Sequence, residues 1–256
     1  MVIRSRTTHI TGHEQRAVTK TASRSHCTSC IFRTRCLPAD LSDAELARFE
    51  FKIGQPYLIR AGHSVVRQGD TQHLMYAVRA GSLKAIAHDV DGTERILAFR
   101  FPGTIACMAD FYEANWAHAF TFVTLENSWL CPIPLHSIDE TLRPQLINLM
   151  SDRLRREYQS HLVLATYSGP RKVAWFLLEL STWLPLLGRS ATDIHLPMSY
   201  MDMASYLGMR HESLSRTLTQ LQKSGVIYKS GKVLRIMDFE ALDQIRTIGA
   251  TKNQSQ

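Results

Sequence analysis

The chain has 256 residues, 45% of them hydrophobic, which suffices for one or two domains that bury ordinary cores without disulfide support. No apolar stretch approaches the roughly 18 to 20 residues of a membrane span, and no apolar run follows the first arginines as it does in a secretory signal. We therefore expect a cytoplasmic protein with no membrane partner. The formal net charge of +7 suits a polyanionic partner, but it is regional: residues 1–37 carry seven basic side chains against Glu14, and residues 195–237 carry six against Asp202 and Glu212.

The N-terminal segment, residues 1–40, is interpreted as a basic arm followed by a cysteine-rich stretch. Residues 1–25 are rich in Thr, Ser, Arg and His with only isolated apolar residues, so we expect no fold there.

Three thiols, Cys27, Cys30 and Cys36, fall within ten residues in a segment too polar to bury them as ordinary core. Soft thiolates at such spacing can hold a metal or an iron-sulfur cluster, which needs four ligands in most cases. A fourth ligand must come from elsewhere. Cys107 and Cys131 are the candidates, and chemistry alone leaves them nearly even because each can also be a small buried hydrophobe.

Residues 41–135 are predicted to form an all-β sandwich or jelly roll. Ser42 and Glu45 fit a capping box that opens a short helix ending near Phe51. Glycine-containing turns then recur about every ten residues between short apolar or alternating runs. Asp91-Gly92, flanked by such runs on both sides, is the clearest hairpin signal.

Residues 136–168 are predicted to contain a long amphipathic helix, which starts near Pro144 and ends at Gly169-Pro170. Its apolar stripe recurs at spacings of three and four residues: Leu146, Met150, Leu154, Tyr158 and His161. The stripe could pack on the β domain of its own chain or pair with a second chain as a coiled coil. The sequence leaves both open.

Residues 170–246 read as a winged helix-turn-helix, with residues 247–256 as a tail. Two short helices meet at Gly208, which relaxes the turn, and the leucines of the second helix supply the shared core. A hairpin around Ser230-Gly231 is predicted to form the wing.

Glu212, Ser215 and Arg216 lie at i, i+3 and i+4 of the second helix and therefore project from one face. Arginine can bond guanine O6 and N7 together, glutamate can accept from cytosine N4, and serine can contact bases or phosphate. On an arbitrary helix, the simplest interpretation of these residues would be a solvent-exposed Glu-Arg pair with no function. The surrounding turn, leucine core and wing favour a surface that reads double-stranded DNA instead.

The chain from about Cys27 resembles the CRP/FNR superfamily of bacterial transcription regulators, because the glycine-punctuated β domain, long helix and winged reader follow in that family's order. Glu212-x-x-Ser215-Arg216 is similar to the FNR branch, the regulators of fumarate and nitrate reduction. The resemblance implies an α+β fold with a cyclic-nucleotide-binding-like jelly roll, a homodimer formed along the long helix, palindromic operators with TTGAT-like half-sites, and contact with RNA polymerase.

The resemblance also bears on the cofactor. Oxygen-sensing FNR regulators carry Cys-x2-Cys-x5-Cys near the N-terminus and a fourth cysteine just before Ile-Pro, a pattern that matches Cys27, Cys30, Cys36 and Cys131. It implies a [4Fe-4S] cluster that favours the DNA-binding dimer and is dismantled by oxygen, and it leaves Cys107 as a core residue. Arg35 stands where the pattern has an apolar residue. The alternative is a regulator of the same family with a structural zinc ion or no cofactor.

Two further classes are disfavoured. The Gly-Glu and Arg-Ser/Thr by which related β domains hold cyclic AMP are replaced by Gly103-Thr104 and by Trp116-Ala117-His118-Ala119, so we expect no cyclic nucleotide. An enzyme with a cysteine nucleophile near His26 lacks a matched set of base and orienting group, a phosphate loop and a zinc-protease motif. We therefore expect no catalytic activity.

Overall fold

The structure is a computed structural model and describes residues 18–20 (backbone only), 27–71, 73–88, 91–108, 117–185 and 190–247. Most of the predicted N-terminal arm, together with His26, Trp116 and the tail beyond Thr247, lies outside these ranges. The expectation that residues 1–25 have no fold is wrong for one short piece. Val18–Lys20 forms strand β1, which pairs antiparallel with β2 and needs only backbone hydrogen bonds to do so.

The predicted β sandwich is confirmed. One sheet has five strands in the order β1-β2-β9-β4-β7, and the other has four in the order β3-β8-β5-β6. The bounds beyond β1 are β2 Tyr57–Ile59, β3 Ser64–Val66, β4 Leu74–Ala80, β5 Leu83–His88, β6 Glu94–Arg100, β7 Ile105–Ala106, β8 Thr121–Thr124 and β9 Ser128–Pro134. The apolar residues that face the interior of the sandwich form one core, which includes Tyr76, Val78 and Leu130.

The five-stranded sheet also has a covered outer face. Successive residues of a strand point to opposite sides, so Met75 and Ala77 of β4 lie outside the sandwich while Tyr76 and Val78 lie inside it. A second core covers this outer face. It joins the sheet to helix α1 (Asp43–Lys52), to the residues between Leu37 and Leu41, and to the first turn of α2.

Two local predictions in the β domain are confirmed. The Ser42 backbone N–H donates to Glu45 Oε2 at 2.9 Å, which closes the capping box of α1. Strands β5 and β6 pair antiparallel from Leu83–Arg100 to His88–Glu94, as the Asp91-Gly92 signal requires. The turn between β4 and β5 depends on Gly81, because its φ of 82° is left-handed and a Cβ there would collide with the backbone of Ser128.

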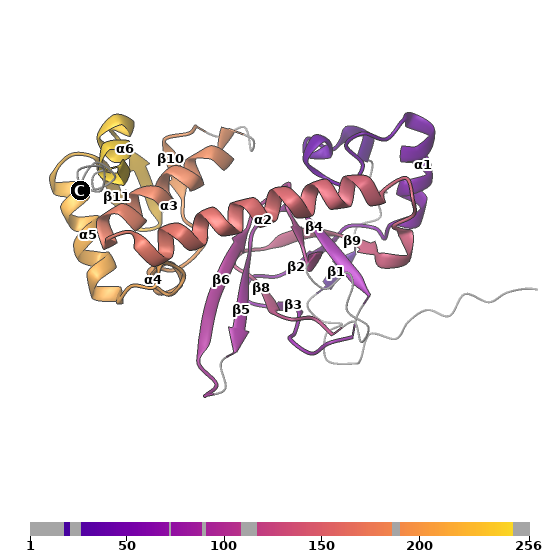
Figure 1. Cartoon of the computed structure of the whole chain (residues 1–256), viewed down its shortest axis with the longest axis horizontal. Coiled ribbons are helices and arrows are strands. Elements are labelled where there is room, and N and C mark those ends of the chain that lie inside the picture. The colour runs from indigo at the N-terminus through magenta and orange to yellow at the C-terminus, as the bar shows by residue number, and fades with distance from the viewer. Residues whose placement is uncertain are drawn as a thin grey trace, which may run out of the picture.

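Helix α2 (Arg143–Thr166) crosses the middle of the molecule and connects its two halves (Figure 1). α1 and the indigo segment that precedes it lie near the N-terminal end of α2, beside the sandwich. At the other end the chain turns back into α3 (Gly169–Trp183). Only two side chains of α2, Leu146 and Val163, are fully buried in the chain, so most of one helical face is exposed.

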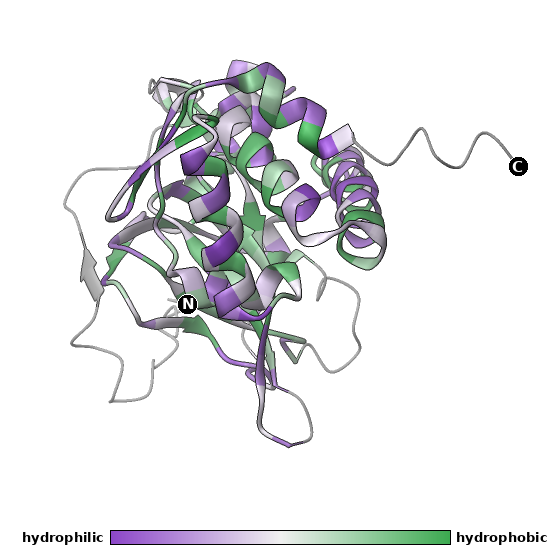
Figure 2. Ribbon diagram, turned by 90° about the vertical axis from the view of Figure 1, so that its left-hand side faces the viewer, coloured by the Kyte–Doolittle hydropathy of each residue, from purple (hydrophilic) through white to green (hydrophobic). Residues whose placement is uncertain are grey.

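The C-terminal domain joins α3 to α4 (Tyr200–Leu207), α5 (His211–Lys223), α6 (Phe239–Thr247) and a three-stranded sheet ordered β10-β12-β11. The strands are β10 Asp193–His195, β11 Ile227–Ser230 and β12 Val233–Ile236. Figure 2 looks onto the C-terminal domain. Its helices carry hydrophilic and hydrophobic residues on the same ribbon, as amphipathic helices do.

The two domains are in direct contact. Lys84 Nζ lies 2.7 Å from Asp202 Oδ1, and the Phe99 ring meets the edge of Tyr206 with centroids 5.2 Å apart. The Ile96 backbone N–H donates to Ser205 Oγ at 3.3 Å. Strand β6 therefore supports α4, an arrangement that no local pattern in the sequence indicates. Within the described ranges, no helix is both long and apolar enough to cross a membrane.

Candidate functional site

Four cysteines from distant parts of the chain line one small cavity. Cys27 starts a short 3-10 turn (η1, Cys27–Ser29), and Cys36 follows a second turn (η2, Arg33–Arg35). Cys131 comes from β9, where it pairs in register with Ala77 on the outer face of the sheet. These three line the cavity together with Cys30, so the structure brings the predicted set of thiols together.

The fifth cysteine stands apart. Cys107 is 3% exposed, packs in the interior of the sandwich, and does not line the cysteine cavity. The prediction that it is a core residue is confirmed. Its φ of 64° is left-handed, which is uncommon for a residue with a side chain.

The environment of the cavity opposes ionisation of the free thiols. Burial, reinforced by the Glu50 carboxylate and the neighbouring thiols, raises the pKa of Cys27 to about 12. Burial also raises the pKa of Cys36. Arg33 and Arg79 line the same cavity, and Arg33 donates to the Leu41 carbonyl at 2.8 Å. These two arginines can therefore offset the negative charge of thiolates that form when a bound metal displaces the thiol protons.

Four cysteine thiols are a donor set that both iron-sulfur clusters and zinc ions use. In the part of the chain that the structure describes, no three His, Cys, Asp or Glu side chains stand close enough to share one metal ion. The thiols of a cluster bind different iron atoms and therefore need not meet so closely. The shared cavity has a volume of only about 30 Å³, room for one or two water molecules, so a larger group enters only if the Cys27–Cys36 segment shifts outward.

The helix-turn-helix is present as predicted. Ser199 caps α4 by accepting from the Asp202 backbone N–H at 3.0 Å, while the Asp202 carboxylate accepts from the Ser199 N–H. Gly208 ends α4 in the left-handed conformation, with φ 60° and ψ 42°. Leu214, Leu218 and Leu221 of α5 are buried in the core of the domain. This framework fixes how the opposite face of α5 is presented.

The predicted reading residues lie on that opposite face. Glu212 and Arg216 are exposed and Ser215 is half-buried, and neither charged group forms an ion pair with another described residue. Strands β11 and β12 form the predicted hairpin, with Lys229 paired to Leu234 and a turn at Gly231-Lys232. An exposed polar helix face beside a basic hairpin has the shape and charge that double-stranded DNA requires.

The predicted stripe of α2 divides between two faces. Leu146 is 1% exposed and belongs to the core beside α1, so it has no surface left for a second chain. Of the two packings that the sequence leaves open for the stripe, Leu146 takes the one on its own sandwich and not the expected dimer contact. Leu154 and Tyr158 are 54% and 67% exposed, and His161 is exposed as well. Met150 is half-buried at the edge of this face.

Sequence reasoning missed Ile147, which is 53% exposed on the same side as Leu154. The positions 147, 151, 154, 158, 161 and 165 alternate in steps of four and three residues, which is the a/d spacing of a coiled coil. The regular heptad could have been found by starting the pattern one residue later.

Comparison with known proteins agrees with this architecture. Residues 58–144 match the cyclic nucleotide-binding domain family, and residues 171–245 match the Crp-like helix-turn-helix domain. The chain is 32% identical over 221 residues to the transcriptional activator protein FnrA of Stutzerimonas stutzeri, covering 83% of this chain and 89% of that protein. It is 30% identical over 235 residues to the fumarate and nitrate reduction regulatory protein of Escherichia coli K12, covering 89% and 92%.

Among solved structures, the fold is similar to that of FixK2 from Bradyrhizobium japonicum, with a TM-score of 0.67 and 24% identity over 75% of this chain and 96% of that one. Sandwich, long helix and helix-turn-helix thus occur in one shared order, and the sequence relationship spans most of both chains. The chain belongs to the CRP/FNR family, and it is a DNA-binding transcription regulator rather than an enzyme.

Proposed function

We propose that the chain is an oxygen- or redox-responsive activator of genes used when oxygen is scarce, and that a [4Fe-4S] cluster held by Cys27, Cys30, Cys36 and Cys131 controls its binding to DNA. The observation that carries the proposal is the convergence of these four thiols, and not Cys107, on one cavity. Similar proteins are named as an anaerobic regulatory protein in Pasteurella multocida and a transcriptional activator in Stutzerimonas stutzeri.

The cluster, when bound, would supply an oxygen-labile centre. The protein's part is mechanical. Cys131 is fixed by the sheet, whereas the other three thiols sit on a segment of short 3-10 turns between residues 27 and 36. A group that bridges Cys131 to this segment would fix the distance between the segment and the sheet. Because the same core includes Leu146 at the first turn of α2, the position of the segment bears on the placement of that helix.

The exposed face of α2 supports dimerisation along this helix. Ile147, Leu154 and Tyr158 offer apolar surface at coiled-coil spacing, and a homodimer is typical of the family. A symmetric dimer presents two α5 helices, so the operator is expected to be a palindrome with half-sites resembling TTGAT, read by Glu212, Ser215 and Arg216. RNA polymerase is the expected partner of the complex on DNA.

The experiment is purification of the full chain without oxygen, followed by an ultraviolet-visible spectrum and an iron and sulfide assay. We expect a brown protein with about four irons per chain whose visible absorbance bleaches in air while operator binding is lost in parallel. A colourless anaerobic protein that carries about one zinc per chain and binds its operator equally with and without air would favour the alternative, a family member with a structural metal.

A further inference from the structure

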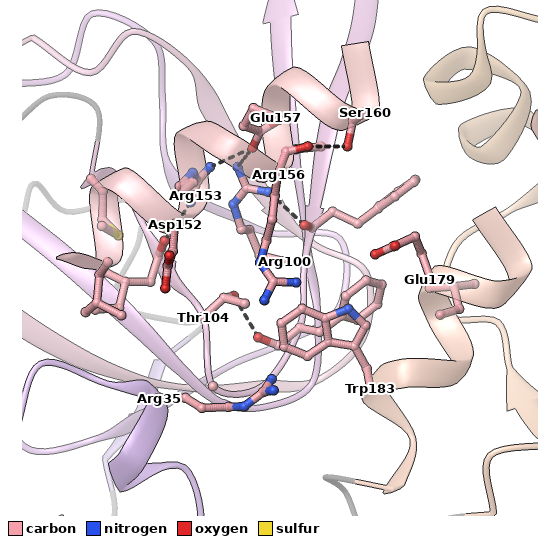
Figure 3. Close-up of a pocket in the computed structure, with 18 of the residues that line it drawn as sticks. Arg35, Arg100, Thr104, Asp152, Arg153, Arg156, Glu157, Ser160, Glu179 and Trp183 are labelled. Atoms are coloured by element: carbon pink, nitrogen blue, oxygen red, sulfur yellow. Dashed lines mark hydrogen bonds and ion pairs between the residues drawn. The ribbon is translucent and has the colours of Figure 1, made fainter. Parts of the chain in front are cut away.

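The arginine before Cys36 reaches across to the DNA-binding domain. Arg35 lies in η2, on the segment from Cys27 to Cys36 that carries three of the four cavity thiols and is called the cysteine segment below. Its guanidinium lies 5.3 Å from the centre of the Trp183 ring, and Trp183 is the last residue of α3. Figure 3 shows the two side chains next to each other, one from each domain. The cysteine segment therefore touches the DNA-binding domain of its own chain directly.

The contact places a cation over an indole ring at the end of a helix. The face of a tryptophan ring attracts a guanidinium electrostatically. α3 has no basic residue in its own last turn, so Arg35 also supplies the positive charge that a helix C-terminus favours. In the described part of the chain, no carboxylate forms an ion pair with Arg35. Trp183 is thus the partner of this side chain.

The same ring is held from the side of the sandwich. Phe101, in the turn between β6 and β7, has its ring centroid 6.1 Å from that of Trp183. Hydrogen bonding fixes this turn, because the Gly103 N–H donates to the Val78 carbonyl at 2.9 Å. Phe32 of the cysteine segment packs against Gly103, whose φ is 84° and where a Cβ would lie only 2.9 Å from the Phe32 ring. Cysteine segment, turn and α3 therefore form one continuous contact.

α3 can pass a change of position on to the reading helix. Its buried face, which includes Leu177, lies in the core of the DNA-binding domain, and it packs against α5 and α6. α5 buries Leu214 in the same core. Because protein interiors are densely packed and transmit displacements, α3 and α5 are expected to move together. The orientation of Glu212 and Arg216 relative to the sandwich then follows that of α3.

We propose that Arg35 is a positioning residue for DNA binding. Through Trp183 it holds the DNA-binding domain in the arrangement described above, in which the reading face of α5 and the stripe of α2 are both exposed. A change in the cysteine segment then reaches the reading helix within one chain, without passing through α2 or a second chain. The use of this contact in oxygen control rests on the proposed function, whereas the contact itself does not.

The contact is tested first in air and without DNA, by tryptophan fluorescence of the full chain. The contribution of Trp183 is the difference between the spectra of paired proteins with and without Trp183→Leu. A cation over the ring alters its emission, so this contribution should change in the Arg35→Leu background. Arg48→Leu is the matched control, since Arg48 is an exposed arginine on α1 whose side chain bonds the Ala44 carbonyl of its own helix. An unchanged contribution in the Arg35→Leu background overturns the proposal.

The positioning role is tested by a double-mutant cycle on operator binding. The Kd is measured by gel shift for wild type, Arg35→Leu, Trp183→Leu and the double variant, in proteins matched for metal content and for dimer fraction in sedimentation. Arg35→Leu should weaken binding about two- to fivefold, the range of one exposed cation–π contact, and Trp183→Leu at least as much. The double variant should bind no more weakly than Trp183→Leu alone. Losses that multiply, or tighter binding by Arg35→Leu, overturn the proposal.

Two further comparisons separate charge from shape and this inference from the cluster. Arg35→Lys keeps the cation and should recover part of the lost affinity, whereas Arg35→Gln should not; equal behaviour of the two excludes the cation–π contact as the cause. If anaerobic protein is colourless, the cluster proposal fails, yet the cycle on that protein still decides whether Arg35 and Trp183 are coupled. With a cluster present, exposure to air should weaken operator binding less in Arg35→Leu than in wild type. An equal loss in both would remove Arg35 from the path between the cysteines and the reading helix.

Discussion

The reading helix and the cysteine cavity are built in opposite ways. Glu212 and Arg216 lie one helical turn apart on a single 13-residue helix, so their common orientation follows from helical geometry alone. Cys36 and Cys131 approach each other only because a strand in the middle of a sheet faces a segment of short turns. A site made by one element tolerates changes elsewhere. A site made by folding together distant segments responds to them, which suits a sensor.

The cysteine cavity offers the largest effect. Cys131→Ala removes one proposed ligand from a fixed strand and should abolish both the visible absorbance of anaerobic protein and anaerobic operator binding. Cys107→Ala is the matched control, since it changes a buried cysteine that does not line the cavity. Colour retained in the Cys131 variant, or lost in both variants alike, would remove the basis for the four-cysteine assignment.

The reading helix should show a smaller and more selective effect. Arg216→Ala should cost about 1 to 3 kcal/mol of operator binding, or about 5- to 150-fold, and relax discrimination at one base pair. Lys232→Ala, in the exposed turn of the wing, should weaken all DNA sequences alike. Gel-shift titration on operators that differ by single base pairs separates a loss at one base pair from a uniform loss of affinity. Full discrimination by the Arg216 variant would argue against its contact with a base.

α2 connects the two regions, and its exposed face can be tested separately. Leu154→Glu places charge on the apolar stripe and should shift anaerobic protein from dimer to monomer in sedimentation, because a buried unpaired carboxylate is costly. Gln159→Glu adds the same charge to an exposed position outside the stripe. If both variants sediment like the wild type, the helix is not the dimer contact.

The smallest effect is expected where the two domains meet. Burial opposes ionisation of Asp202, but the bonds from Lys84 and Ser199 hold its pKa below the ordinary 3.8. A depressed folded-state pKa adds stability above that pH and loses it as the pH falls through the folded value. Asp202→Asn should therefore cost on the order of 1 kcal/mol at neutral pH, and the difference from wild type should vanish in acid. Thermal unfolding at several pH values checks this, with Asp243→Asn in α6 as the control.

Much of the fold could be predicted because its signals are local. The capping box at Ser42, the turn at Gly208 and the hairpin at Asp91-Gly92 each depend on a few adjacent residues, and all are present. The reading face of α5 follows from the same kind of periodicity.

What could not be predicted depends on packing between elements. Spacing reveals the heptad that begins at Ile147, but it does not show that Leu146 packs on its own sandwich beside α1. Nor does it show that Cys131 lies on the outer face of the sheet, or that the arginine before Cys36 reaches Trp183 in the other domain. These contacts follow from how strands and helices are placed in three dimensions.

The exposed stripe of α2 has a consequence for how the cell could set the response. Its heptad positions are not uniformly apolar, since Ser151 and His161 interrupt Ile147, Leu154 and Tyr158, and polar side chains at such positions weaken coiled-coil pairing. A weak pair leaves many chains single at low abundance, and the number of pairs then grows with the square of the chain concentration. Doubling synthesis of the protein would raise the amount of paired regulator about fourfold in that regime. In that regime the expression level of the protein would itself control how much paired regulator is available to bind DNA.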